Sequence, residues 1–217
     1  DNGIMIPIDI ALKDPSLQGD DSRIVMDKAE IFIREMTAAK KPFYIYLCFH
    51  AVHTPLVTIP ETHQKFYSEL SARDANYYSN ISAIDAQMGR LRSLLRELNV
   101  ADNTMLWYSS DNGPNLKGKS NPQKAAAQDG KFTYTKIGST GAYKGWKRYM
   151  WEGGVRVCGL IEWPNVIKSK LDQNYPVVTT DFVPTALAAV GLKASDKKPL
   201  DGENLLPYFQ GKQQRRG

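Results

Sequence analysis

The sequence predicts an α/β fold in which a mostly parallel sheet is flanked by helices. Three apolar runs, at residues 43–49, 104–109 and 155–163, have the length and composition of strands that are buried on both faces. A helical pattern at 22–39 precedes the first run, and a longer one at 73–98 lies between the first and the second. Because two strands that are joined through a helix pair in parallel by a right-handed crossover, this order predicts a parallel sheet.

The two long helices are predicted from apolar residues at alternating steps of three and four. The core-facing residues of the first helix are Val25, Ala29, Phe32, Ile33 and Met36, and those of the second are Ile81, Ile84, Met88, Leu91, Leu95 and Leu98. The pair Asp20-Asp21 predicts the N-cap of the first helix. Lys40 and Lys41 complement its C-terminal dipole, and Pro42 ends it.

The other segments are shorter or irregular, and together they predict one partial domain over 1–217. In chain order they are an irregular lead-in at 1–20, a short helix near 61–70, a long polar excursion at 114–140, a possible fourth strand at 176–180, a helix at 182–190, a last helical turn at 202–210 and a basic tail at 211–217. Loops as long as the polar excursion are usually functional or mobile in compact domains.

Composition excludes several classes of protein. At 42% apolar residues the chain can bury a substantial core, and it contains none of the apolar runs of about 18 residues that a membrane span needs. The net charge is +5, but the basic residues gather at 117–147 and 212–216 without interleaved aromatic residues, so no nucleic-acid partner is predicted. A solvated excursion and tail, with some attraction of an anionic substrate, is expected instead. Cys48 and Cys158 fall inside predicted strands and are expected to be small apolar fillers.

The tripeptide Asp111-Asn-Gly113 follows the second apolar run and places a carboxylate and an amide at the tip of a strand. Such tips are where open α/β sheets build their sites. Both groups offer hard oxygen donors, which suit Ca²⁺ or Mg²⁺. Asn-Gly is also the strongest two-residue hairpin signal, although no clear return strand follows Pro114. Taken alone, the tripeptide leaves a turn and a metal loop equally open.

Two other segments lie at the ends of predicted strands. His50-Ala-Val-His-Thr-Pro55 follows the first run, and Lys144-Gly-Trp-Lys-Arg-Tyr-Met-Trp-Glu-Gly-Gly-Val-Arg156 leads into the third. With the Asp-Asn-Gly loop they resemble, in the same order, three motifs of the sulfatase family, within the alkaline-phosphatase-like superfamily. The resemblance extends from about 21 to about 210 and includes Asp181 before a Pro-Thr-Ala-Leu helix and Asp201-Gly202.

The resemblance implies a sulfuric ester hydrolase and assigns roles to four residues. Asp111 and Asn112 match metal ligands, and the metal is expected to be Ca²⁺, with Mg²⁺ as an alternative. His53 matches the histidine that hydrogen-bonds the ester oxygen and protonates the leaving alcohol. Lys147 matches a lysine that contacts the sulfate. The expected substrate is a sulfated small molecule or glycan. Of the remaining groups, His50 is as compatible with packing as with a hydrogen bond in the site, and Trp146 and Trp151 as compatible with a core as with a sugar-binding surface; Glu152 and Arg156 are expected to form a structural ion pair.

Sulfatases that resemble this chain carry, toward their N-terminus, an Asp pair and a Cys/Ser-x-Pro-x-Arg motif whose first residue becomes formylglycine. Neither is present here, and Ser120-Asn-Pro-Gln-Lys124 follows the Asp-Asn-Gly loop and has Lys in place of Arg. The chain is therefore expected to be the C-terminal portion of a catalytic domain, inactive alone, with the formylglycine in a missing N-terminal segment, which could be a separate chain. The family resemblance favours an extracytoplasmic location.

Two other functions remain open from the sequence. A phosphoester or phosphonate hydrolase of the same superfamily would share the metal-site plan. A non-catalytic protein could instead bind sulfated glycans through the basic residues at 117–147. A nucleophile motif in upstream sequence would favour the enzyme.

Overall fold

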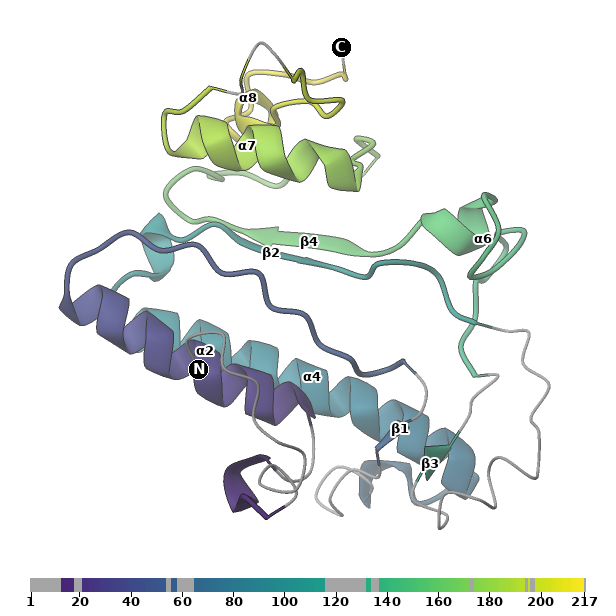
Figure 1. Cartoon of the computed structure of the whole chain (residues 1–217). Helices are drawn as coiled ribbons and strands as arrows, with labels where there is room; N and C mark the ends of the chain where they lie inside the picture. Colours follow the sequence, from purple (N-terminus) through teal and green to yellow (C-terminus); the bar gives the residue numbers. More distant parts are fainter. Residues whose placement is uncertain are drawn as a thin grey trace. The chain divides into compact units, whose positions relative to one another are not determined.

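The computed structural model describes residues 13–17, 21–53, 56–57, 65–115, 132–133, 137–171, 174–193, 195 and 198–216. The chain forms two compact units (Figure 1). The first comprises Asp1–Asn99 and Asp111–Val157, and the second comprises Val100–Ser110 and Cys158–Gly217. Most of the lead-in and of the polar excursion, with Asp20, His63 and residues 120–124, lie outside the described residues.

Two long helices dominate the first unit, as the sequence predicts. They are α2 (Asp21–Ala38) and α4 (Ala72–Glu97), which pack side by side in Figure 1. The shorter elements of this unit are η1 (Pro15–Leu17), β1 (Leu56–Val57), η2 (Lys65–Tyr67), β3 (Phe132–Thr133) and α6 (Glu152–Val155). β1 pairs with β3 in an antiparallel ladder, so the polar excursion contains a short strand that its sequence does not predict.

The buried faces of the two helices differ somewhat from the predicted stripes. In α2, Ala29 and Ile33 are buried as expected, but Met26 is buried and Phe32 is exposed. In α4, Ile81 is exposed, whereas Leu94 lies in the core. The buried face of each helix is therefore rotated slightly from the face that apolar periodicity predicts.

Ion pairs join the polar edges of α2 and α4. Arg90 donates to Asp27 at 2.6 Å and to Glu30 at 2.5 Å. Arg34 donates to Glu30 at 2.9 Å and to Glu97 at 2.8 Å. The hydrogen bonds from Arg34 and Arg90 hold the pKa of Glu30 below its ordinary value. This network links the two helices along one edge.

The predicted strand at 43–49 is extended but belongs to neither of the ladders formed by the described residues. Its side chains alternate between half-buried and exposed, and Tyr44 and Tyr46 are among the exposed ones. Cys48 is exposed too, as is Cys158, and both are free, so the expectation of buried fillers is wrong.

The second unit is built on the antiparallel pair of β2 (Leu106–Ser109) and β4 (Gly159–Glu162), in which Leu106 lies opposite Glu162 and Ser109 opposite Gly159. Both ladders formed by the described residues are thus antiparallel. The other elements of this unit are η3 (Ala101–Asn103), η4 (Thr179–Asp181), α7 (Phe182–Ala189) and α8 (Leu206–Phe209).

Aromatic side chains form the core of the second unit. Trp107 of β2 contacts Phe182 and Phe209 edge to face, with ring centroids 5.4 Å and 5.9 Å away. Tyr175 stacks on Tyr208 at 3.9 Å. These rings are the apolar cover for the strand pair.

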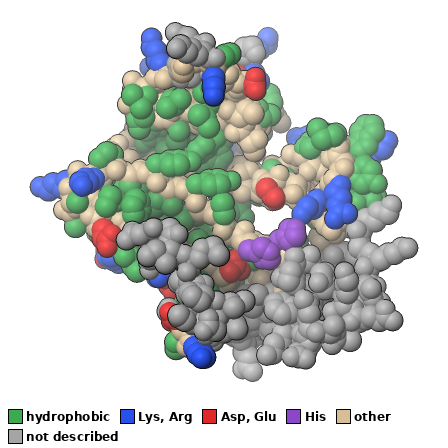
Figure 2. Space-filling model, in the orientation of Figure 1, with side chains coloured by type: hydrophobic (Ala, Val, Ile, Leu, Met, Phe, Trp, Pro, Cys, Tyr) green, Lys and Arg blue, Asp and Glu red, His purple; other side chains and the backbone are tan. Residues whose placement is uncertain are grey.

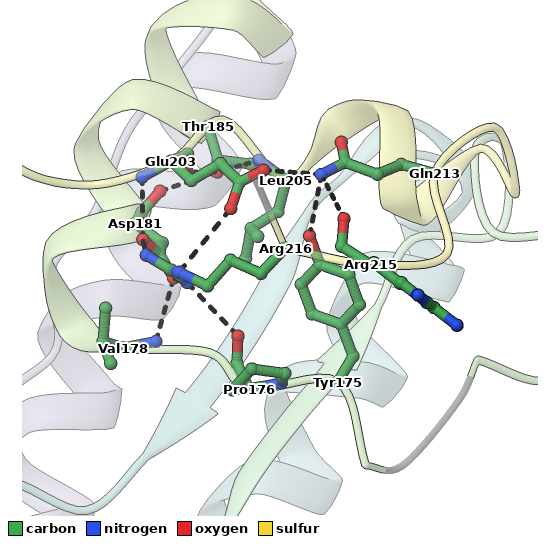
Figure 3. Close-up of polar contacts among 10 residues, drawn as sticks. All are labelled: Tyr175, Pro176, Val178, Asp181, Thr185, Glu203, Leu205, Gln213, Arg215 and Arg216. Carbon is green, nitrogen blue, oxygen red and sulfur yellow. Dashed lines mark hydrogen bonds and ion pairs between the residues drawn. The ribbon is translucent and has the colours of Figure 1, made fainter.

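A buried carboxylate explains why 176–180 is not the predicted fourth strand. The side chain of Asp181 is fully buried and accepts hydrogen bonds from the backbone N–H groups of Val178, at 2.9 Å, and Glu203, at 2.8 Å. Arg216 binds both of its oxygens, at 2.6 Å and 2.8 Å (Figure 3). The local bond to Val178 turns the chain into η4, and the basic tail is hydrogen-bonded through Arg216 and Gln213.

Candidate functional site

The Asp111–Gly113 loop begins just after β2 and does not form a hairpin. The partner of β2 is β4, which is far along the chain, so the turn alternative for Asn112-Gly113 is excluded. The loop continues into Pro114, which packs beside Gly138: a Cβ atom on Gly138 would lie 2.8 Å from Pro114 Cβ and 3.3 Å from the hydroxyl of Tyr77 in α4. Gly138 thus packs against both Pro114 and Tyr77 of α4.

Closely packed glycines join this loop to the Lys147 segment. The N–H of Gly113 donates to the carbonyl of Gly154 at 2.9 Å, and the N–H of Gly153 donates to the carbonyl of Lys144 at the same distance. A Cβ atom on Gly113 would lie 2.0 Å from the oxygen of Gly153, and one on Gly153 would lie 2.2 Å from the oxygen of Gly145. Only glycine lets these backbones approach so closely.

Lys147 is positioned by its own backbone. Its N–H donates to the carbonyl of Pro114 at 3.0 Å, so Lys147 is brought directly to the Asp111–Asn112 loop. The side chain is half-buried, and no described residue forms an ion pair with it. An ammonium group without a counter-ion in a half-buried position suits an anionic ligand. The structure thus brings together three of the four predicted site residues.

The fourth predicted residue, His53, lies on the loop after 43–49. The N–H of His50 donates to the carboxylate of Asp21 in the first turn of α2, at 2.9 Å, and the N–H of His53 donates to the carbonyl of His50, at 2.7 Å. The two imidazole rings are exposed, with centroids 5.4 Å apart. Figure 2 shows both histidines on one face of the molecule, on which Lys and Arg side chains also gather. Asp21 therefore anchors the histidine loop.

Tyr46, in the segment 43–49 that precedes the histidine loop, has a shifted pKa. The pKa of the Tyr46 phenol is raised, first by Cys48 and, among smaller causes, by the carboxylate of Asp111. Tyr46 and Asp111, which are distant in sequence, both belong to the first unit.

The side chains of Asp111 and Asn112 carry the type of oxygen atoms that bind hard cations. The Asp111 side chain is exposed, and the amide nitrogen of Asn112 donates to the carbonyl of Gly113 at 2.8 Å, which turns the amide oxygen away from that carbonyl. A carboxylate and an amide oxygen are ligands of Ca²⁺, which takes six to eight oxygens. Among the described residues no group of three or more His, Cys, Asp or Glu side chains could hold a metal.

The structure also shows the surroundings of other residues of the Lys147 segment, which the sequence alone does not give. Arg156 forms the expected ion pair with Glu152 at 3.1 Å, but both side chains are more than half exposed, so the pair adds little stability. Trp151 is exposed, which excludes core packing for its ring. The glycine contacts are signalled in the sequence by Glu-Gly-Gly, whereas the contacts of Pro114 with Gly138 and Tyr77 have no sequence signal.

Comparison with protein families identifies what this arrangement is similar to. The Sulfatase family model matches residues 7–192. Steryl-sulfatase of Homo sapiens is 30% identical over 193 residues, which are 89% of this chain and 30% of that protein. Arylsulfatase H of Homo sapiens is 32% identical over 174 residues, 80% of this chain and 28% of that protein. The chain thus spans less than a third of the length of these curated relatives.

Solved structures agree with the family match. Ps i-CgsB, solved in complex with k-i-k-neocarrahexaose, superposes with a TM-score of 0.73 and 28% identity over 88% of this chain and 38% of that one. The PsFucS1 sulfatase from Pseudoalteromonas sp. superposes with a TM-score of 0.66 and 26% identity over 90% of this chain and 36% of that one. These matches confirm the α/β class. Separately, no helix among the described residues has the length and hydropathy that a membrane crossing requires.

Proposed function

Because this chain belongs to the sulfatase family, we propose that it supplies part of the active site of a metal-dependent sulfuric ester hydrolase. The observation that carries the proposal is the hydrogen bond between Lys147 N–H and the Pro114 carbonyl, which holds beside the Asp111–Asn112 loop a lysine that no described residue pairs with. Residues outside this sequence would supply the nucleophile, a formylglycine, and the remaining metal ligands. The substrate is a sulfate ester of a small molecule or glycan, and extracytoplasmic action fits this chemistry.

The reaction consumes water and breaks the bond between sulfur and the ester oxygen. Negative charge builds on the sulfuryl oxygens and on the leaving oxygen as that bond lengthens. The Lys147 ammonium stabilises the sulfuryl oxygens, and His53 donates a proton to the leaving oxygen, which departs as an alcohol. Asp111 and Asn112 would hold Ca²⁺, or Mg²⁺ in its place. When bound, that cation supplies further positive charge to the sulfuryl oxygens.

The test is substitution in the complete enzyme. Lys147→Ala and His53→Ala should each lower kcat on an aryl sulfate by about 30-fold to 1000-fold, because each removes a transition-state contact of about 2 to 4 kcal/mol. Both side chains lie outside the core, so the thermal midpoint should change little.

Arg148→Ala is the matched control, since Arg148 is the exposed cation next to Lys147. A cation that only attracts the anion should change the salt dependence of kcat/KM and leave kcat nearly unchanged. Normal turnover in Lys147→Ala would contradict the assigned role, and normal turnover in both Lys147→Ala and His53→Ala would contradict the proposed function.

A further inference from the structure

Four side chains of the segment that carries Lys147 form what we call the aromatic–cationic surface: Tyr143, Lys144, Trp151 and Arg156. The ammonium of Lys144 lies 4.0 Å from the centre of the Trp151 ring, and the guanidinium of Arg156 lies 4.7 Å from that of Tyr143. All four side chains are exposed, with 52% of Trp151 accessible. Large aromatic rings with cations against their faces are thus presented to solvent.

The composition of this surface restricts the ligand that it can take. Residues 143–156 contain four cations and one carboxylate, so an anionic partner is favoured. An entirely apolar ligand gains most from an enclosed apolar pocket, which this exposed ring does not provide. A ring such as Trp151 offers an apolar face, and the neighbouring cations offer charge-assisted hydrogen bonds. The matching ligand has a flat face of C–H groups and carries anionic substituents.

We propose that the aromatic–cationic surface binds the saccharide part of a sulfated glycan, with a sugar ring against the exposed part of the Trp151 ring and sulfate groups on Lys144 and Arg156. This inference rests on the proposed function for its choice of a sulfated ligand. The backbone places the surface at the candidate site, because the carbonyl of Lys144 accepts from Gly153 while Gly113 donates to Gly154. A glycan bound there would extend from the position of Lys147.

The first test measures binding by the 217-residue chain, with a carrageenan-type sulfated hexasaccharide as the probe and calorimetry as the readout. Trp151→Ala should weaken binding by about 10-fold, the loss expected for one aromatic contact. Trp151→Tyr should restore most of the affinity, since tyrosine keeps a flat face. Lys144→Ala should weaken binding by about 5-fold and reduce its dependence on ionic strength.

The chain offers a matched control. Phe66 is another exposed ring, 69% accessible, with the ammonium of Lys65 at 5.2 Å. Phe66→Ala should leave the affinity unchanged. Equal losses in Trp151→Ala and Phe66→Ala, or no loss in Trp151→Ala, would overturn the proposal. So would equal binding of the desulfated hexasaccharide, or tighter Trp151-dependent binding of a thymidine oligonucleotide of matched length, which would identify a nucleic-acid surface.

Failure of this inference can be distinguished from failure of the proposed function, because the binding assay requires no turnover. If Lys147→Ala abolishes turnover in the complete enzyme while Trp151→Ala leaves hexasaccharide binding intact, the enzyme assignment stands and the glycan surface is refuted. If Trp151→Ala abolishes binding while Lys147→Ala retains turnover, the surface stands and the role of Lys147 falls.

Discussion

At Gly153 the position that a Cβ atom would take lies 2.2 Å from the carbonyl oxygen of Gly145 and 2.8 Å from that of Lys144. Both neighbours are backbone atoms, which cannot turn aside as a side chain can. The Lys147 segment therefore folds back on itself through a contact that any larger residue would open. Sequence reasoning assigned Asp111 and Asn112 from their place after a predicted strand and Lys147 from the family resemblance, but this contact depends on the path of the backbone between residues 144 and 153, which sequence spacing does not define.

Gly153→Ala should lower the free energy of unfolding of the chain by about 1 to 3 kcal/mol, because the backbone at Lys144 and Gly145 must move to admit the methyl group. Urea denaturation followed by tryptophan fluorescence measures the change. Gly89→Ala is the control: Gly89 lies in the middle of α4 with nothing within 4 Å of its Cβ position. That variant should be more stable by about 0.5 to 1 kcal/mol. A Gly153→Ala chain as stable as the parent would show that Gly153 does not pack against the backbone of residues 144 and 145 as described.

At the level of elements, helices were predicted better than strands. The expected helices at 22–39 and 73–98 correspond to α2 and α4, because a helix satisfies its hydrogen bonds within one segment, so a local pattern is sufficient. A strand needs a partner that its sequence does not name. The apolar run 43–49 is extended without a ladder, and β2 pairs with β4 instead of an adjacent segment.

The ion pair between Arg216 of the tail and Asp181 of η4 is a second feature that local sequence patterns could not reveal. Arg216→Ala should lower the free energy of unfolding by about 3 kcal/mol, because it leaves the fully buried carboxylate of Asp181 without its cation. Arg215→Ala removes a neighbouring exposed arginine and should have almost no effect. The same denaturation measurement compares the two, and equal stability of both variants would contradict the role of the buried pair.

The same variant should change the dependence of stability on pH. Burial alone raises the pKa of Asp181, but Arg216 and the N–H groups of Val178 and Glu203 outweigh burial and hold the pKa below its ordinary value. A depressed pKa stabilises the fold above the unfolded value of about 4 and loses that effect as the pH falls through the folded value. In Arg216→Ala the effect of burial on the pKa of Asp181 is less opposed, so this pKa should be higher than in the parent chain. The loss of stability on acidification should therefore begin at higher pH in the variant.

For the whole molecule, the chain covers 30% of steryl-sulfatase, and the proposed function places the nucleophile and the other metal ligands outside this sequence. The 217-residue chain by itself should therefore show no turnover of 4-nitrophenyl sulfate above a buffer blank. A spectrophotometric assay with added Ca²⁺ tests this. Hydrolysis that disappears in Ser120→Ala would contradict the expectation and identify Ser120 as a nucleophile.

The pairing of β2 with β4 has a consequence for biosynthesis. Residues 110–158 lie between Ser109 and its partner Gly159, so this ladder cannot exist until Glu162 has left the ribosome. The α2–α4 pair, by contrast, is complete once Glu97 has been made. Closing the long intervening segment carries an entropic cost that local helix pairing avoids. During translation the apolar side chains of β2, including Trp107, are therefore without their strand partner while the entire Lys147 segment is being synthesised, and that interval is when a nascent chain would depend most on a chaperone.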